Sequence, residues 1–258
     1  MALGEGRWRA TALTRGPWHP EHQHAGPPVA LAARAIARAA AARGFAHLAR
    51  ITANLLRPIP IAELEVSVQE DYVGRTAAHY SAQLAGDNKE LARLSALALR
   101  DTEFALPAEL AGHALPRAAR PPEDSPPAVF PFLQGEPGYP ELVETRVAEG
   151  RMFDGPSAIW FRLRYPLVAG ETPAPIERVA VAADSANGIS AILDFRRHSF
   201  VNCDLTIHLL RPAEGEWVCI EAQTYLGPRS SGLAEARIYD ADGLVGRAIQ
   251  SLVLRRRE

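Results

Sequence analysis

An internal repeat is the feature that most constrains how this sequence can fold. The tetrapeptide Leu55-Leu56-Arg57-Pro58 returns 154 positions later as Leu209-Leu210-Arg211-Pro212. Two further matches keep nearly the same spacing: Tyr72-Val73-Gly74 with Tyr225-Leu226-Gly227, and Arg93 with Arg247. Self-similarity at an almost fixed spacing indicates that one structural unit occurs twice in the chain.

A proline-rich stretch separates the two copies. Residues 104–140 contain nine prolines and show little hydrophobic periodicity. Because proline fixes φ and lacks an N–H donor, we expect an extended connector here. The predicted organisation is therefore an N-terminal unit over 1–103, a linker over 104–140 and a C-terminal unit over 141–258.

Each copy has one expected helix followed by strands. The Ala-rich run from Pro28 to Arg43 lacks glycine and favours a helix that ends at Gly44. A second helix is expected from about Pro175 to Asn187, where Asn187-Gly188 is a stop signal. Strand-like runs follow at 46–56, 62–72, 75–85 and 91–100, and again at 199–210, 216–226, 232–240 and 244–255. The pattern predicts an α+β fold in which an antiparallel sheet wraps an apolar helix, twice.

Composition excludes several classes of partner. The formal net charge of −2 gives no electrostatic reason to expect nucleic acid, and the basic run Arg255–Arg257 is interpreted as a solvated tail. No apolar run approaches the roughly 18–20 residues that span a bilayer, and no signal-peptide pattern occurs. The two cysteines, Cys203 and Cys219, lack CxxC spacing. We therefore expect a cytoplasmic, reduced protein without a structural zinc and without membrane partners.

Short motifs in a constant order suggest a family. They are His24-Ala25-Gly26-Pro27-Pro28, Leu56-Arg57-Pro58-Ile59-Pro60, Ala183-Asp184-Ser185-Ala186-Asn187, Asn202-Cys203-Asp204-Leu205, Leu210-Arg211-Pro212 and Gln250. With two sheet-wrapped helices in tandem, the chain resembles the type II acyl-CoA thioesterases. The resemblance implies a double hot-dog fold, an acyl-CoA substrate hydrolysed to free acid and CoA, and no cofactor.

The same resemblance implies three catalytic positions. In that family an Asp on the second helix, a Thr or Ser on the following strand and a Gln on the last strand hold the attacking water. By position these residues are Asp184, Asn202 and Gln250. Asparagine here replaces a hydroxyl residue, although its amide can also donate and accept hydrogen bonds.

The repeat provides an internal control on these three positions. The residues 154 positions before Asn202 and Gln250 are Leu48 and Ala96, and no acidic residue lies between Glu21 and Glu63. A structural requirement of the fold would be expected in both copies, whereas a catalytic group is needed only once. The asymmetry therefore favours a catalytic role for the second copy.

Asp184 has a structural alternative as well as a catalytic interpretation. It follows an apolar run near a helix C-terminus, where partial burial is expected to raise its pKa and suit it to general-base chemistry. The alternative is an ion pair with Arg178.

His24 and Gly26 are predicted to bind substrate. They precede or begin a helix, where free backbone N–H groups could hold the thioester carbonyl or its oxyanion. The alternative is a surface cluster of His19, His22 and His24. No acidic or cysteine ligands accompany that cluster, so a metal site is not expected.

Arg57 and Arg211 recur in both copies, which favours a structural role. Contact with the phosphates of CoA is the alternative. Two other functions stay open for the chain. One is hydration or dehydration of enoyl thioesters, with His24 paired to Asp184, and the other is acyl-CoA binding without catalysis. A homodimer is also open, although two units in one chain already supply the pairing of single-unit relatives.

Overall fold

The computed structural model describes residues 1–4, 6–110, 115–133 and 135–257. Within them the helices are α1 (Gly26–Ala42), α2 (Tyr139–Leu142), α3 (Pro175–Ala183) and α4 (Ala186–Ile189). The strands of the first half are β1 (Ala2–Gly4), β2 (Arg7–Arg9), β3 (His47–Leu55), β4 (Glu63–Val73), β5 (Ala77–Gly86) and β6 (Lys89–Leu99). Those that follow are β7 (Pro127–Ala128), β8 (Val143–Gly150), β9 (Ser157–Leu163), β10 (His198–Asn202), β11 (Asp204–Leu209), β12 (Trp217–Leu226), β13 (Ser231–Asp240) and β14 (Gly243–Arg256).

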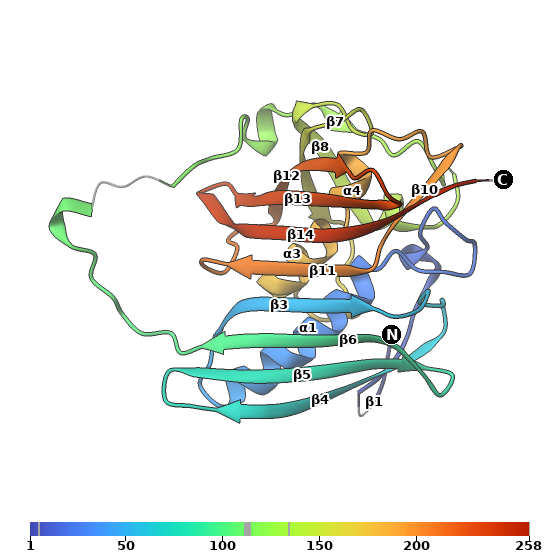
Figure 1. The fold of residues 1–258 in the computed structure, drawn as a ribbon. Helices are drawn as coiled ribbons and strands as arrows, with labels where there is room; N and C mark the ends of the chain where they lie inside the picture. Colours follow the sequence, from blue (N-terminus) through green and yellow to red (C-terminus); the bar gives the residue numbers. More distant parts are fainter. Residues whose placement is uncertain (5, 111–114, 134, 258) are drawn as a thin grey trace.

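One antiparallel sheet runs through both halves of the protein. Its order at the centre is β4-β5-β6-β3 followed by β11-β14-β13-β12, so the second half repeats the first in mirror order. Figure 1 shows β3 and β11 side by side at this seam, with the helices behind the sheet. The arrangement confirms the α+β plan of two sheet-covered helical units.

A pair of threonines marks the centre of the duplication. Thr52 on β3 faces Thr206 on β11, and their hydroxyl oxygens are 3.3 Å apart. The two residues are 154 positions apart, which is the spacing of the sequence repeat. A residue therefore meets its own repeat equivalent at this point, and the two copies are related by a pseudo-twofold axis through the seam.

Helix α1 forms where the Ala-rich run predicts it. Prolines occupy its first turn. The helix ends in a Schellman motif, in which the Phe45 N–H donates to the Ala40 carbonyl and the Gly44 N–H donates to the Ala41 carbonyl. Gly44 has φ of 79°, a left-handed conformation that glycine adopts without strain. Most of the helix is buried against the sheet and α3, which explains its lack of a broad polar face.

The second helix ends earlier than predicted. Helix α3 stops at Ala183, and Asn187-Gly188 lies inside the separate short helix α4. The Ser185 N–H bonds to the carbonyl of Ala182, three residues back, so the last turn tightens and the regular helix ends. Asp184 therefore lies at the break between the two helices, as the C-cap residue of α3.

Two further expectations about the C-terminal strands need correction. The run expected as one strand over 199–210 is divided at Cys203 into β10 and β11, which both pair with β14. The basic C-terminal run is exposed to solvent as expected, but its first two residues are not a tail, because Arg255 and Arg256 belong to β14 and pair with Ser199 and His198.

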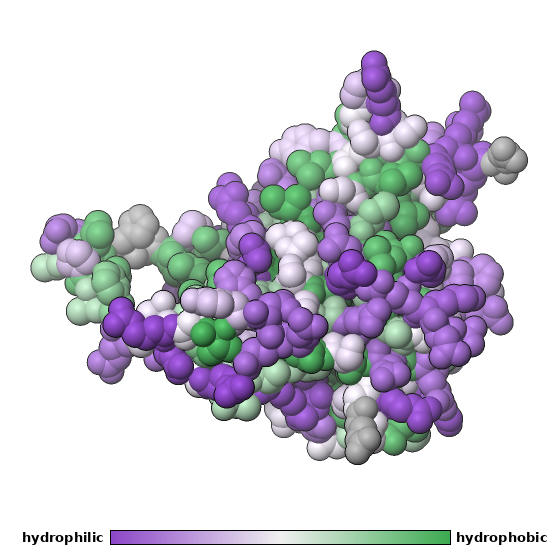
Figure 2. Space-filling model, turned by 60° about the horizontal axis from the view of Figure 1, so that its bottom comes forward, coloured by the Kyte–Doolittle hydropathy of each residue, from purple (hydrophilic) through white to green (hydrophobic). Residues whose placement is uncertain are grey.

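The proline-rich stretch changes character along its length. Its first part leaves β6 and stands away from the sheet, with Phe104 80% exposed (Figures 1 and 2). Its second part is not a simple extended connector, because β7 pairs with β8 and both Phe130 and Tyr139 are buried. The limits of the two domains and the linker stay a prediction. Within the described residues, no helix is long and apolar enough to cross a membrane.

Candidate active site

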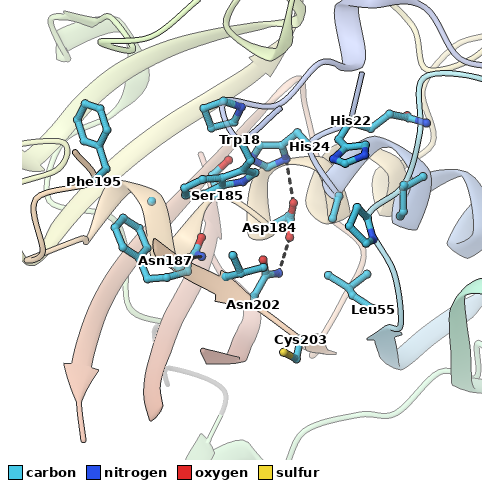
Figure 3. A pocket seen from close by; sticks show the side chains of 18 of the residues that line it. Trp18, His22, His24, Leu55, Asp184, Ser185, Asn187, Phe195, Asn202 and Cys203 are labelled. Carbon is cyan, nitrogen blue, oxygen red and sulfur yellow. Dashed lines mark hydrogen bonds and ion pairs between the residues drawn. The ribbon is translucent and has the colours of Figure 1, made fainter. Parts of the chain in front are cut away.

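A cavity of about 330 Å³ lies beside the predicted site residues. The segment before α1, the chain after β3, the α3–α4 junction and β10 all contribute to its wall (Figure 3). Aromatic side chains make much of the lining: Trp18, Phe130, Phe132, Phe153, Phe195 and Phe200. Such a lining favours an apolar ligand, with a small number of polar groups to fix its orientation.

Asp184, Asn202 and Gln250 come together from three elements. The Nδ2 of Asn202, at the end of β10, donates to Oδ1 of Asp184 at 2.8 Å. The Nε2 of Gln250, within β14, lies 3.4 Å from the same oxygen and donates to the Asp184 carbonyl at 3.2 Å. Asp184 and Asn202 line the cavity, whereas Gln250 is fully buried behind them.

His24 completes the surroundings of the carboxylate. Its Nδ1 lies 2.8 Å from Oδ2 of Asp184, on the opposite side from Asn202 (Figure 3). The Gly26 amide nitrogen is 3.3 Å from the same Nδ1. The contact of Nδ1 with Asp184 is the shorter of these two, and an ionised carboxylate can only accept a hydrogen bond. We therefore place a proton on Nδ1, so that His24 donates to Asp184. The predicted alternative partner, Arg178, instead donates to the carbonyls of Pro173 and Ala213.

The environment lowers the pKa of Asp184, contrary to the expectation. Burial acts to raise this pKa, but the charge of His24 and its hydrogen bond act against burial, together with hydrogen bonds from Asn202 and the Gly26 amide. Their combined effect holds the pKa below its usual value. The side chain is therefore an ionised carboxylate at neutral pH, although it is only 4% exposed.

Tyr139 and Ser185 support this arrangement and were not found from the sequence. The Tyr139 ring stacks on His24 at a centroid distance of 3.8 Å and an angle of 6°. Its hydroxyl donates to the Val181 carbonyl at 2.9 Å and lies 2.8 Å from Oγ of Ser185. Burial raises the pKa of Tyr139, so it stays a neutral phenol. The proline-rich surroundings of Tyr139 gave no periodic signal that could have placed it here.

The start of α1 offers fewer free donors than a typical helix N-terminus. Pro27 and Pro28 have no N–H, which leaves the amides of Ala25 and Gly26. The Ala25 N–H has no protein acceptor within the described part of the chain, and Ala25 lines the cavity.

Gly26 does not line the cavity. A Cβ built on it would stand 2.8 Å from the carbonyl oxygen of Val181, so this glycine allows α1 to pack closely on α3.

The histidine cluster near this helix is divided by the fold. His19 and His22 stack on each other at 4.3 Å, whereas His24 turns toward Asp184. Within the described residues, no group of three or more His, Cys, Asp or Glu side chains is placed to hold a metal ion.

The fold and the site together define a class of protein. Its members have two copies of a helix covered by an antiparallel sheet, and here a buried carboxylate lies beside an apolar cavity. The acyl-CoA thioesterase N-terminal domain matches residues 14–100, and the acyl-CoA thioesterase C-terminal domain matches residues 120–254. The chain therefore belongs to the acyl-CoA thioesterase family.

Solved structures with the same fold support this assignment of the architecture. A putative thioesterase II from Thermobifida fusca YX superposes with a TM-score of 0.76 at 17% identity, covering 98% of this chain and 94% of that one. The acyl-CoA thioesterase II TesB2 from Mycobacterium marinum gives 0.70 at 15%, covering 100% and 96%. A protein with a hot dog fold from Alicyclobacillus acidocaldarius gives 0.73 at 14%, covering 98% and 93%. These likenesses show that the fold is a double hot-dog. No curated protein matches the chain significantly.

Proposed function

We propose that this protein hydrolyses acyl-CoA thioesters to a free acid and CoA. The observation that carries the proposal is the buried carboxylate of Asp184, which lies in the wall of an apolar cavity and is held by His24, Asn202 and Gln250. The aromatic lining suits an acyl group, and membership of the family supports a thioester as substrate.

Asp184 and Asn202 can hold the attacking water between them. Nδ2 of Asn202 donates to Asp184 and to the Asp204 carbonyl, which leaves Oδ1 of Asn202 as an acceptor. A water in this position would donate one hydrogen to Asp184 and the other to Asn202. Gln250 does not line the cavity, so its role in the proposal is to fix the carboxylate and the backbone around it.

The reaction then proceeds by addition and elimination. As the water oxygen attacks the carbonyl carbon, Asp184 accepts its proton, and the Ala25 N–H at the start of α1 stabilises the oxyanion. Collapse of the tetrahedral intermediate breaks the C–S bond and releases CoA, whose thiolate takes up the proton that Asp184 had accepted from the water, which restores the carboxylate. Because the pKa of Asp184 is lowered, the carboxylate is a weak base, and the orientation of the water is an important part of its contribution.

Hydrolysis over short, medium and long acyl-CoAs tests this proposal. Free CoA is best measured by chromatography, because Cys203 is exposed beside the cavity and would react with a thiol reagent. Asp184→Asn should lower kcat by about 10²–10⁴-fold, because it removes the general base. Asp204→Asn is the matched control, because Asp204 bonds to Ser251 and does not line the cavity. Unchanged hydrolysis in Asp184→Asn would refute the assignment, and binding without turnover in the unsubstituted protein would favour the non-catalytic alternative.

The contact between His24 and Asp184 favours a second candidate, hydration of an enoyl thioester. A histidine 2.8 Å from a carboxylate is an arrangement that can move a proton to or from a water. Incubation with an enoyl-CoA distinguishes the two reactions. Hydration consumes the double bond and leaves the thioester intact, whereas hydrolysis releases free CoA.

A further inference from the structure

The two arginines that recur in the repeat have different environments. Arg211 forms two hydrogen bonds with the carboxylate of Asp240, at 2.5 and 2.6 Å. The Asp240 side chain is fully buried and also accepts from the backbone amides of Glu214, Asp242 and Gly243. Arg211 is therefore committed to a structural ion pair, as the recurrence suggested.

Arg57 lacks this partner. The residue 154 positions before Asp240 is Gly86, so the first half has no equivalent carboxylate. Arg57 donates from Nη1 to the backbone carbonyl of Glu90 at 2.6 Å. The Glu90 carboxylate accepts two hydrogen bonds of 2.8 Å from Arg93. Within the described residues, no hydrogen bond or ion pair joins Arg57 to a carboxylate, and its exposed side chain lines the cavity.

A second arginine reaches the same cavity from the other half. Arg257 follows β14 and is exposed, yet it also lines the cavity. Its Nε donates to the His198 carbonyl at 3.2 Å, and its backbone N–H donates to the Arg197 carbonyl. In the described part of the chain it too has no hydrogen bond or ion pair with a carboxylate. Both arginines are exposed, line the cavity and donate to backbone carbonyl oxygens.

We propose that Arg57 and Arg257 bind the phosphate groups of CoA, an inference that rests on the proposed function. Guanidinium groups fit phosphate oxygens with paired hydrogen bonds. Neither Arg57 nor Arg257 donates a hydrogen bond to a carboxylate of the described residues, although the nearby charge of Arg57 helps to lower the pKa of Glu90. The thioester would lie at Asp184 inside the cavity, and the phosphates would remain where it opens. Because Gly86 stands where the second half has Asp240, Arg57 lacks the ion pair that holds Arg211 and would be available to recognise the CoA part of the substrate.

Calorimetric titration with free CoA tests this inference without requiring turnover. Arg57→Gln should raise the Kd for CoA about tenfold and leave binding of pantetheine, which has no phosphate, unchanged. Arg57→Lys should give a smaller loss, because it keeps the charge without the planar fork. Arg257→Gln should also weaken CoA binding. Arg75→Gln, in the exposed turn between β4 and β5, makes the same change in net charge and should have no effect.

The kinetics separate this inference from the proposed function. Arg57→Gln should raise KM for an acyl-CoA, with kcat little changed, and should not change KM for the matching acyl-pantetheine. If the protein binds CoA through these arginines but hydrolyses no thioester, the proposed function fails and the inference stands. Equal CoA binding by Arg57→Gln and the unsubstituted protein would overturn the inference. A loss confined to thioesters of an acyl carrier protein would also overturn it, because the arginines would then recognise an acidic protein.

Discussion

Asn202 holds Asp184 through a hydrogen bond of 2.8 Å between Nδ2 and Oδ1. The contact joins the end of β10 to the break between α3 and α4, two places where regular structure stops. The repeat equivalent of Asn202 is Leu48, a buried residue of β3, so this link exists only in the second half.

We expect Asn202→Ala to lower kcat/KM for an acyl-CoA by about tenfold to a hundredfold. The substitution removes a hydrogen bond to a charged group, worth about 1.5–3 kcal/mol, and also removes the second group that would hold the water. Asn202→Thr should recover part of the loss, because its hydroxyl can both donate and accept. Steady-state kinetics check this, with Asn54→Ala on the exposed face of β3 as control. An Ala variant as active as the unsubstituted protein would remove Asn202 from the site.

His24→Phe should shift the acid limb of the pH–rate profile to higher pH. The Phe ring can keep the stacking on Tyr139 but removes the charge and hydrogen bond that lower the pKa of Asp184. Burial, which raises that pKa, then dominates, so the carboxylate is protonated at a higher pH.

The same pKa shift affects stability in acid. A lowered folded-state pKa adds stability that is present above the unfolded value of about 3.9 and is lost as pH falls through the folded value. His24→Phe should therefore lower the free energy of unfolding at neutral pH, and its difference from the unsubstituted protein should shrink as pH falls through the low folded value. His22→Phe is the matched control, because His22 lines the same cavity without contacting Asp184. Identical pH profiles for the His24 variant and the unsubstituted protein would contradict the coupling.

The repeat allowed much of the fold to be predicted, because a spacing of 154 residues fixes which elements correspond. It also identified the polar residues present in only one half. The details of the site depend on contacts that sequence order does not reveal. His24 and Asp184 lie in different halves, and Tyr139 joins them from the proline-rich stretch. The direction of the Asp184 pKa shift could not be foreseen, because burial and three nearby donors act in opposite directions.

Gln250→Leu should destabilise the fold as well as slow the reaction. The amide is fully buried, and it donates to the Asp184 carbonyl and accepts from the Asn187 N–H at 3.1 Å. Leucine would leave both backbone groups without a partner, at a cost of about 1–3 kcal/mol in the free energy of unfolding. Urea unfolding measures this change, and Gln223→Leu at an exposed position of β12 should have little effect. Lost activity with unchanged stability would instead indicate that Gln250 contacts the water directly.

The two arginines of the repeat should differ in their contribution to stability. Arg211→Gln leaves the buried Asp240 carboxylate without its charged partner and should lower the free energy of unfolding by about 3 kcal/mol. Burial raises the pKa of Asp240, but Arg211 and the backbone amides outweigh it and hold this pKa low. The ion pair therefore stabilises the fold at neutral pH, and this stabilisation is lost as pH falls through that low value. The free energies of unfolding of Arg211→Gln and of the unsubstituted protein should converge in acid. Arg57→Gln, at the equivalent position without a carboxylate, should change stability by less than about 0.5 kcal/mol. Denaturant unfolding at several pH values tests this, and equal losses for the two variants would show that Arg57 is structural as well.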